Sequence, residues 1–289
     1  MADRRRKTLV AALAGAVGLA GALAVSARAR AEQAVAPELC QACAVLTVAE
    51  SKRLIAKGVA RLPAVKAALE KGTVIVTTGT TDTYVAEELL GEKLPHGEFV
   101  TGRTTPAKGG KEVKPAGEPI AVIIIRNGKR VEGLTLEAAL AELKAGDVVI
   151  KGANALDYEN KVAGVLVGSP TGGTVGKIVP YVIARKAVLV IPVGLEKLTP
   201  GVGGELARKM REPVKSLNRV PSMFPITGEI VTELEALRLL GGVEAFQAAG
   251  GGVGGAEGGR WLVFRGDRES VEKTLKLVES IQGEPAFVP

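Results

Sequence analysis

The stretch VAGVLVGSPTGGTVGKIVPYVIARKAVLVIPVGLEK, residues 162–197, decides the fold class. The apolar run at 162–167 predicts a strand, the glycine-rich segment at 168–176 a turn, and the apolar spacing that follows a helix through Ile183. A second apolar run, at 187–193, predicts another strand. This order is typical of a parallel sheet whose strands are joined by helices.

The same order occurs closer to the N-terminus. TVIVTT at 73–78 predicts a buried strand, GTTDT at 79–83 a turn, and YVAEELLG at 84–91 a helix that ends at a glycine. Asn127-Gly128 predicts a hairpin, and a further strand is expected at 147–151. We therefore predict a doubly wound, mainly parallel α/β sheet, in which ligands bind where the strands end.

Both glycine turns have residues suited to an anion. Backbone N–H groups at a helix N-terminus present positive partial charge, and glycine lets a ligand approach the backbone closely. The alternative for the first turn is that Thr81 or Asp82 only caps the helix. We predict an anion site between the turn at 79–81 and the loop at 172–174, with Lys177 and Lys197 as cations.

Three blocks of sequence resemble the superfamily of ribose-5-phosphate isomerase A, glucosamine-6-phosphate deaminase and the CoA transferases, which includes the lactate-utilisation domains. VIVTTGTTDTYVAEEL, from Val74, resembles the first strand and phosphate-loop helix of that superfamily. KGANALD, from Lys151, resembles its acidic loop, and SPTGGTVGKIVPYVIARKAVLVIPVGLEKL, from Ser169, its glycine loop, helix and strand ending in lysine. The resemblance covers residues 51–200. It implies the superfamily fold and a phosphorylated, carboxylated or CoA-type metabolite as ligand.

The ligand-binding residues predicted from the turns and from this resemblance are Gly79, Thr80, Thr81, Asp82, Lys151, Asn154, Gly172, Gly173, Thr174, Lys177 and Lys197.

The chain also departs from the isomerases. They have Asp-Gly-Ala-Asp-Glu where this chain has KGANA at 151–155, and a glutamate where it has Gly176. Removing a proton beside a carbonyl requires a positioned base, so we expect no isomerase activity. A CoA transferase requires a nucleophilic glutamate. Glu159 is the nearby candidate, and a solvated turn residue is the alternative. We assign no catalytic residue, cofactor or metal.

The C-terminal quarter differs in pattern. Residues 210–225 contain three prolines and are expected to link an α/β domain at 45–209 to a small domain at 226–289. The latter has the order β-α-β-β-α, beginning with a strand at 226–231 and a capping box from Thr232 to Glu235. We predict a ferredoxin-like α+β unit. So small a unit commonly needs a partner surface, which makes a homo-oligomer one possible arrangement.

The N-terminal segment, residues 1–31, contains TLVAALAGAVGLAGALAVSA at 8–27 without a charged residue. Its length equals the ~20 residues that cross a bilayer, and basic residues flank it. We expect a single membrane helix there. Alternatives are export after cleavage at Ala29-Arg30-Ala31, and an alanine-rich soluble helix, which would leave the chain cytoplasmic.

The net charge of +7 does not indicate a nucleic-acid partner. Residues 1–31 hold six basic residues and one acid, which leaves 32 basic and 30 acidic residues in the rest. Aromatic residues make up only 3%, too few to provide stacking platforms for bases. Two function classes remain: a metabolite-binding protein or enzyme of the superfamily above, and a membrane-tethered, non-catalytic module that senses a ligand or assembles with itself.

Overall fold

The computed structural model describes residues 38–102, 104–105, 108 and 117–287. Residues Cys40–Pro289 belong to one compact unit, which is separate from Met1–Leu39. The membrane helix predicted at 8–27 and the cleavage site beside it lie outside the described residues. Within the described part, no helix is both long and apolar enough to cross a bilayer.

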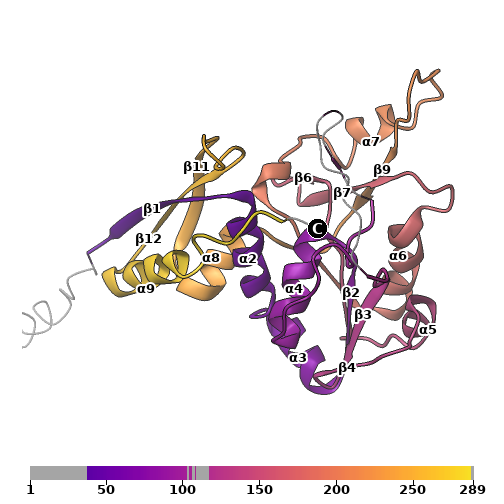
Figure 1. Cartoon of the computed structure of the whole chain (residues 1–289), viewed down its shortest axis with the longest axis horizontal. Helices are drawn as coiled ribbons and strands as arrows, with labels where there is room; N and C mark the ends of the chain where they lie inside the picture. Colours follow the sequence, from indigo (N-terminus) through magenta and orange to yellow (C-terminus); the bar gives the residue numbers. More distant parts are fainter. Residues whose placement is uncertain (1–37, 103, 106–107, 109–116, 288–289) are drawn as a thin grey trace, which may run out of the picture. The chain divides into compact units, whose positions relative to one another are not determined.

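A six-stranded mixed sheet is the centre of the unit (Figure 1). Its strands, in spatial order, are β10 (Glu229–Val231), β8 (Val188–Pro192), β5 (Val148–Ile150), β2 (Thr73–Thr77), β3 (Val122–Arg126) and β4 (Lys129–Arg130). The first four are mutually parallel, and β3 runs antiparallel to both of its neighbours, β2 and β4. Asn127 and Gly128 both have positive φ between β3 and β4, as a two-residue hairpin turn requires, so the predicted hairpin is confirmed.

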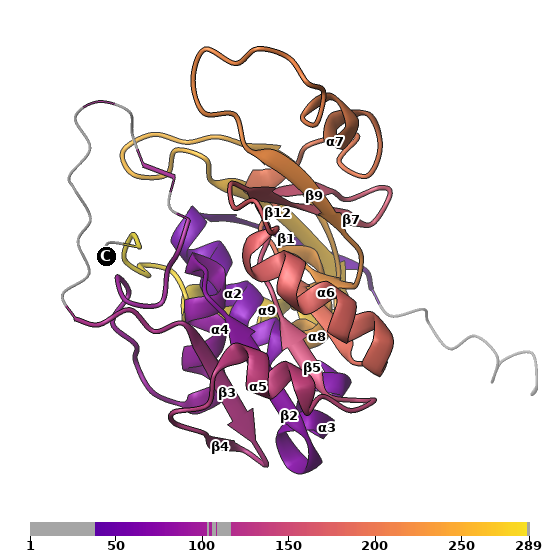
Figure 2. The same cartoon turned by 90° about the vertical axis from the view of Figure 1, so that its right-hand side faces the viewer.

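Helices cover both faces of this sheet (Figure 2). Val74 and Val76 of β2 pack with α2 (Val48–Val59), α3 (Pro63–Lys71) and α4 (Thr80–Leu90). Ile75, which points to the opposite face, packs with α5 (Leu136–Ala141) and α6 (Gly173–Arg185). Because both faces are covered, the central strands are apolar throughout rather than alternating. The predicted mixed α/β class is confirmed.

A second sheet changes the expected role of one strand. It has the order β6 (Ala155–Asp157), β7 (Val162–Val167) and β9 (Ser222–Ile226), all antiparallel. The strand predicted at 162–167 forms, but it does not join the parallel strands. The Asp157 carboxylate accepts hydrogen bonds from Asn160, and this turn folds β7 back onto β6. The predicted linker at 210–225 also includes most of β9.

A third sheet has the order β1 (Cys40–Leu46), β12 (Arg260–Gly266) and β11 (Glu244–Gly250). Helices α8 (Glu233–Gly241) and α9 (Arg268–Glu279) pack on it, and the predicted capping box of Thr232 and Glu235 begins α8.

The composition of this sheet corrects the expected β-α-β-β-α unit. Its first strand was expected at 226–231, but Glu229–Val231 pairs with β8 in the central sheet. The third strand is β1, which comes from the other end of the described chain. A short 3-10 turn, Leu195–Lys197, and helix α7, Glu205–Lys209, complete the described elements.

Candidate functional site

A cavity of about 910 Å³ lies where β2, β5 and β8 end, and we call it the sheet-end cavity. All predicted binding residues except Lys177 line it. The structure therefore brings together the turn after β2, the loop after β5, the glycine loop before α6 and the lysine that follows β8. Their convergence is the expected consequence of parallel strands that end at one edge of a sheet.

The N-terminus of α4 forms one wall of this cavity. Gly79 is the N-cap residue, and no side chain caps the helix. The alternative in which Thr81 or Asp82 serves as the cap is therefore not what the structure shows. The hydroxyl of Thr81 is buried and has no hydrogen-bond partner among the described residues. This wall offers backbone N–H groups of the first helical turn and a hydroxyl without a partner.

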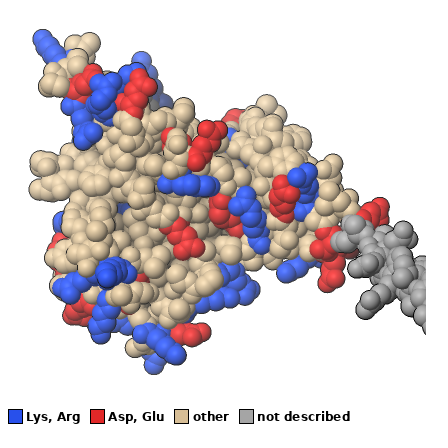
Figure 3. Space-filling view, turned by 180° about the vertical axis from the view of Figure 1, so that it is seen from behind, with Lys and Arg blue, Asp and Glu red and all other residues tan. Residues whose placement is uncertain are grey.

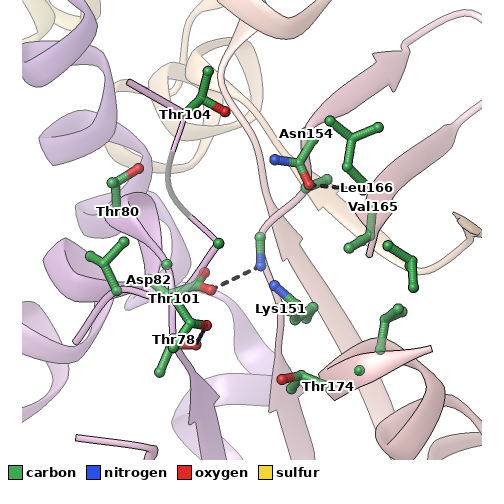
Figure 4. Close-up of a pocket in the computed structure, with 18 of the residues that line it drawn as sticks. Thr78, Thr80, Asp82, Thr101, Thr104, Lys151, Asn154, Val165, Leu166 and Thr174 are labelled. Atoms are coloured by element: carbon green, nitrogen blue, oxygen red, sulfur yellow. Dashed lines mark hydrogen bonds between the residues drawn. The ribbon is translucent and has the colours of Figure 1, made fainter. Parts of the chain in front are cut away.

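The N-terminus of α6 forms a second wall. Gly172 and Gly173 have φ values of 82° and 57°, in the left-handed region that favours glycine. A Cβ atom at Gly172 would also lie 3.0 Å from Cα of Gly176, a tight contact that further favours glycine at this position. No side chain caps α6 either, and Thr174 in its first turn lines the cavity (Figure 4). Two helix N-termini thus face one cavity.

An acid and two lysines lie between these walls. Asp82 is fully buried, and its Oδ2 accepts a hydrogen bond of 3.1 Å from the Gly152 backbone (Figure 4). Burial raises the pKa of Asp82, and the positive charge of Lys151 opposes that shift. Burial likewise lowers the pKa of Lys151, opposed by Asp82. Lys197 donates a 2.8 Å hydrogen bond to the carbonyl of Ala153.

Lys177 is the predicted cation that the structure places elsewhere. Its ammonium group pairs with Glu137 of α5 at 2.6 Å, and about half of its side chain is exposed. It lies on α6 one turn beyond Gly173, where the helix surface faces α5 rather than the cavity. The structure thus places Lys177 outside the described lining of the cavity. Glu159 is exposed in the turn between β6 and β7 and does not line the cavity.

Sequence reasoning also missed residues that line the cavity. Lys52 comes from α2, Thr78 and Thr101 share a 2.7 Å hydrogen bond beside the turn after β2, and Arg219 donates to the carbonyl of Gly168. Thr78 is the last residue of the strand predicted at 73–78 and directly precedes the turn at 79–81, which is a signal that could have included it. Lys52 lies within an amphipathic helix, where a lysine ordinarily faces solvent.

The two cysteines are not among the described residues that line the cavity. Cys40 and Cys43 are both free and lie on β1, and Cys43 is exposed. No group of three metal-ligating side chains is found among the described residues. On the face drawn in Figure 3, basic and acidic side chains are interspersed.

Comparisons with models of protein families, with curated proteins and with solved structures find no match to this chain.

Proposed function

We propose that this protein binds a small anionic metabolite, with a phosphate, carboxylate or CoA-type group held in the sheet-end cavity. The observation that carries the proposal is the meeting of two uncapped helix N-termini at one cavity that lysines also line. Helix N-termini attract anions through free N–H groups and through the helix dipole. Each charge-assisted hydrogen bond adds more than a neutral bond would.

The charge balance of the lining supports an anion rather than a cation. Among the described lining residues the ionisable side chains are four basic ones, Lys52, Lys151, Lys197 and Arg219, and one acid, Asp82. Burial favours the protonated form of Asp82, which reduces its repulsion of an anion. Several threonine hydroxyls around the cavity, including Thr78, Thr80 and Thr104, can donate to phosphate or carboxylate oxygens.

We further propose a relation to the isomerase and CoA-transferase superfamily, with its doubly wound fold. In support, each of the three blocks of sequence that resemble it contributes a loop to the same cavity. These are the turn after β2, the loop after β5 and the glycine loop before α6. One feature differs from the doubly wound fold expected for that superfamily: β7 lies in a separate sheet.

The test is a thermal-shift titration of the full chain with inorganic phosphate, ribose 5-phosphate, CoA and citrate. The informative pair of variants is Lys151→Met and Lys177→Met, which make the same change inside and outside the cavity. We expect Lys151→Met to weaken binding by a factor of about 10 to 150, the equivalent of one charge-assisted bond of roughly 1.5 to 3 kcal/mol. Lys177→Met should bind like the unaltered chain.

Two results would reject the proposal. One is that no anion raises the unfolding temperature of the unaltered chain. The other is that both variants lose binding equally, because the anion would then be held by general surface charge rather than by the cavity.

A further inference from the structure

Lys52, Glu196 and Glu233 form a buried group of ionisable side chains beside the sheet-end cavity, which we call the buried lysine cluster. Lys52 belongs to α2 and lines the cavity, with only 10% of its side chain exposed. Its Nζ lies 4.0 Å from Oε1 of Glu196. Glu233, at the start of α8, is fully buried and accepts the backbone N–H of Leu195 at 3.0 and 3.3 Å.

Glu196 is the unusual member of this cluster. Its side chain is 15% exposed, and neither carboxylate oxygen has a hydrogen-bond partner within the described part of the chain. A buried carboxylate in that state is costly unless it has a charge or a proton to interact with. Among the described residues, the cation found within 4.0 Å of it is the ammonium group of Lys52. The cluster therefore combines an amine at the cavity wall with a proton acceptor behind it.

Burial also makes the free amine of Lys52 accessible near neutral pH. It lowers the pKa of Lys52 to about 8; the charge of Lys197 adds to this shift, and the charges of Glu196 and Glu233 oppose it. At pH 7, Lys52 is then a free amine in about a tenth of the protein molecules, whereas an ordinary lysine is a free amine in about 0.03% of them. Burial and the neighbouring Glu196 raise the pKa of Glu233 to about 7.

The three lysines at the cavity are not equivalent. Lys197 is bound to the carbonyl of Ala153, and Lys151 interacts with the buried carboxyl of Asp82. Among the described residues, the ion pair found for the Lys52 ammonium group is the long one with Glu196, and no hydrogen bond of this group is found there. Lys52 is therefore the amine whose lone pair is least engaged once the proton has left. A desolvated lysine in a cavity is a common form of activated nucleophile.

We propose that Lys52 forms an imine with the aldehyde or ketone group of a small anionic ligand held in the sheet-end cavity. This inference rests on the proposed function for the anionic part of the ligand and adds the class of its reactive group. Oxo acids and the open-chain forms of sugar phosphates carry both groups.

The step balances without a further reactant. The neutral amine nitrogen attacks the carbonyl carbon, and the carbonyl electron pair moves to oxygen, which takes a proton. The nitrogen loses both of its protons in turn: the first is the one that the oxygen takes, and the second leaves with the hydroxyl as water while the C=N double bond forms. Glu196 is positioned to accept the proton that Lys52 releases and to return it to the leaving hydroxyl. Glu233, half protonated near pH 7, supports that exchange.

The test traps the imine with borohydride on the full chain. Pyridoxal phosphate and 5'-deoxypyridoxal serve as a matched pair of probes, which share an open aldehyde and differ by the phosphate group. At one equivalent of probe, peptide mapping by mass spectrometry should place the reduced adduct at Lys52, with pyridoxal phosphate reacting at least tenfold faster. The rate should rise with pH to a half-point near 8.

Variants sharpen the assignment. Lys52→Arg keeps the charge and should abolish the cavity adduct, whereas Lys177→Arg should retain it. Glu196→Gln should slow trapping at least tenfold and change the pH profile, which a purely structural role would not do. If Lys52→Arg does not fold, the mapped site in the unaltered chain still decides, because it identifies the reacting residue directly.

The outcomes separate the two proposals. Adducts spread over exposed lysines, or centred on Lys151 or Lys197, overturn the assignment of Lys52. Equal labelling of Lys52 by both probes supports the imine and counts against the anion site. Thermal stabilisation by phosphate with no adduct at Lys52 supports the anion site and overturns the imine.

Discussion

Glu233 shows how burial of one carboxyl group connects the site to the stability of the fold. The residue is fully buried at the first turn of α8, and its pKa is raised to about 7, first by burial and then by Glu196. The folded state therefore binds a proton that the unfolded state releases above its ordinary pKa of 4.5. A proton held more tightly in the folded state means that stability decreases as the pH rises through this window.

Glu233→Gln should remove this dependence. In the unaltered chain, the contribution of Glu233 to the free energy of unfolding is fully present below pH 4.5 and is lost by about pH 7. The loss amounts to up to about 3 kcal/mol, at about 1.4 kcal/mol for each unit of pKa shift. Glutamine keeps an oxygen that can accept the Leu195 N–H, so the variant should fold. Urea unfolding at pH 4.5, 5.5 and 7 measures the change.

Glu279→Gln is the matched control for this experiment, because Glu279 is exposed on α9. Its profile should follow that of the unaltered chain. An unchanged slope in Glu233→Gln would show that other groups cause the dependence.

Individual residues of the site differ in how readily the sequence predicts them. Gly79 and Thr81 follow a strand directly, so the local pattern places them at the end of the sheet. Lys177 lies only four residues beyond Gly173, but the helix turns its side chain towards Glu137. Lys52 precedes the first strand of the central sheet by a whole helix. Which neighbour packs on a helix face depends on tertiary contacts that no local pattern contains.

At the scale of elements, the close approach of α2 and α8 holds the buried lysine cluster in place. A Cβ atom on Gly58 of α2 would lie 2.6 Å from Cβ and 2.8 Å from Cα of Ala236 of α8. Such distances require one helix to move. Because Lys52 and Glu233 lie on these two helices, their spacing depends on the absence of a side chain at Gly58.

Gly58→Ala should therefore destabilise the protein by about 1 to 3 kcal/mol, the usual cost of overpacking. This result would be opposite in sign to the gain of about 1 kcal/mol that alanine brings to an exposed helix position. Urea unfolding gives the change from the shift of the midpoint at an unchanged slope.

Ala236→Gly provides the control through a double-mutant cycle. The single change should cost about 1 kcal/mol through helix propensity. Combined with Gly58→Ala, it makes room for the added methyl group. The double variant should therefore lose at least about 1 kcal/mol less free energy of unfolding than the two single losses added together. Additive effects would mean that the two residues do not contact each other as described.

The elements also show why the sheets were predicted only in part. Most helices and strands of the central sheet follow from apolar spacing, glycine turns and capping residues, as in α4 and α8. Strand partners do not follow, because pairing joins segments far apart in the chain. Ile230 was expected in the C-terminal α+β unit and pairs with β8 of the central sheet, while Ala42 lies in a strand that was not predicted at all.

At the scale of the whole molecule, we expect the uncharged segment at 8–27 to place the protein at a membrane. We expect the full chain to sediment with membranes and to resist a carbonate wash, and a chain that starts at Glu32 to remain in the supernatant. The reason is that 20 residues without charge match the thickness of the hydrocarbon core.

Val17→Arg tests the same segment without shortening it. A charge at the centre of a membrane helix costs about 2.5 to 3.5 kcal/mol on insertion scales, so the membrane-bound fraction should fall. Equal distribution of the full chain, this variant and the chain from Glu32 would argue against a membrane helix.

The pairing of β1 with β12 has a consequence for how the protein is made. Leu46 lies opposite Arg260, so 214 positions separate the partners in the chain. At a ribosomal speed of about 5 to 20 residues per second, the nascent chain carries β1 without its partner for roughly 10 to 40 s. An unpaired strand is a template for wrong association with other chains. The first described strand, β1, therefore has no partner until β12, the last described strand, has been translated.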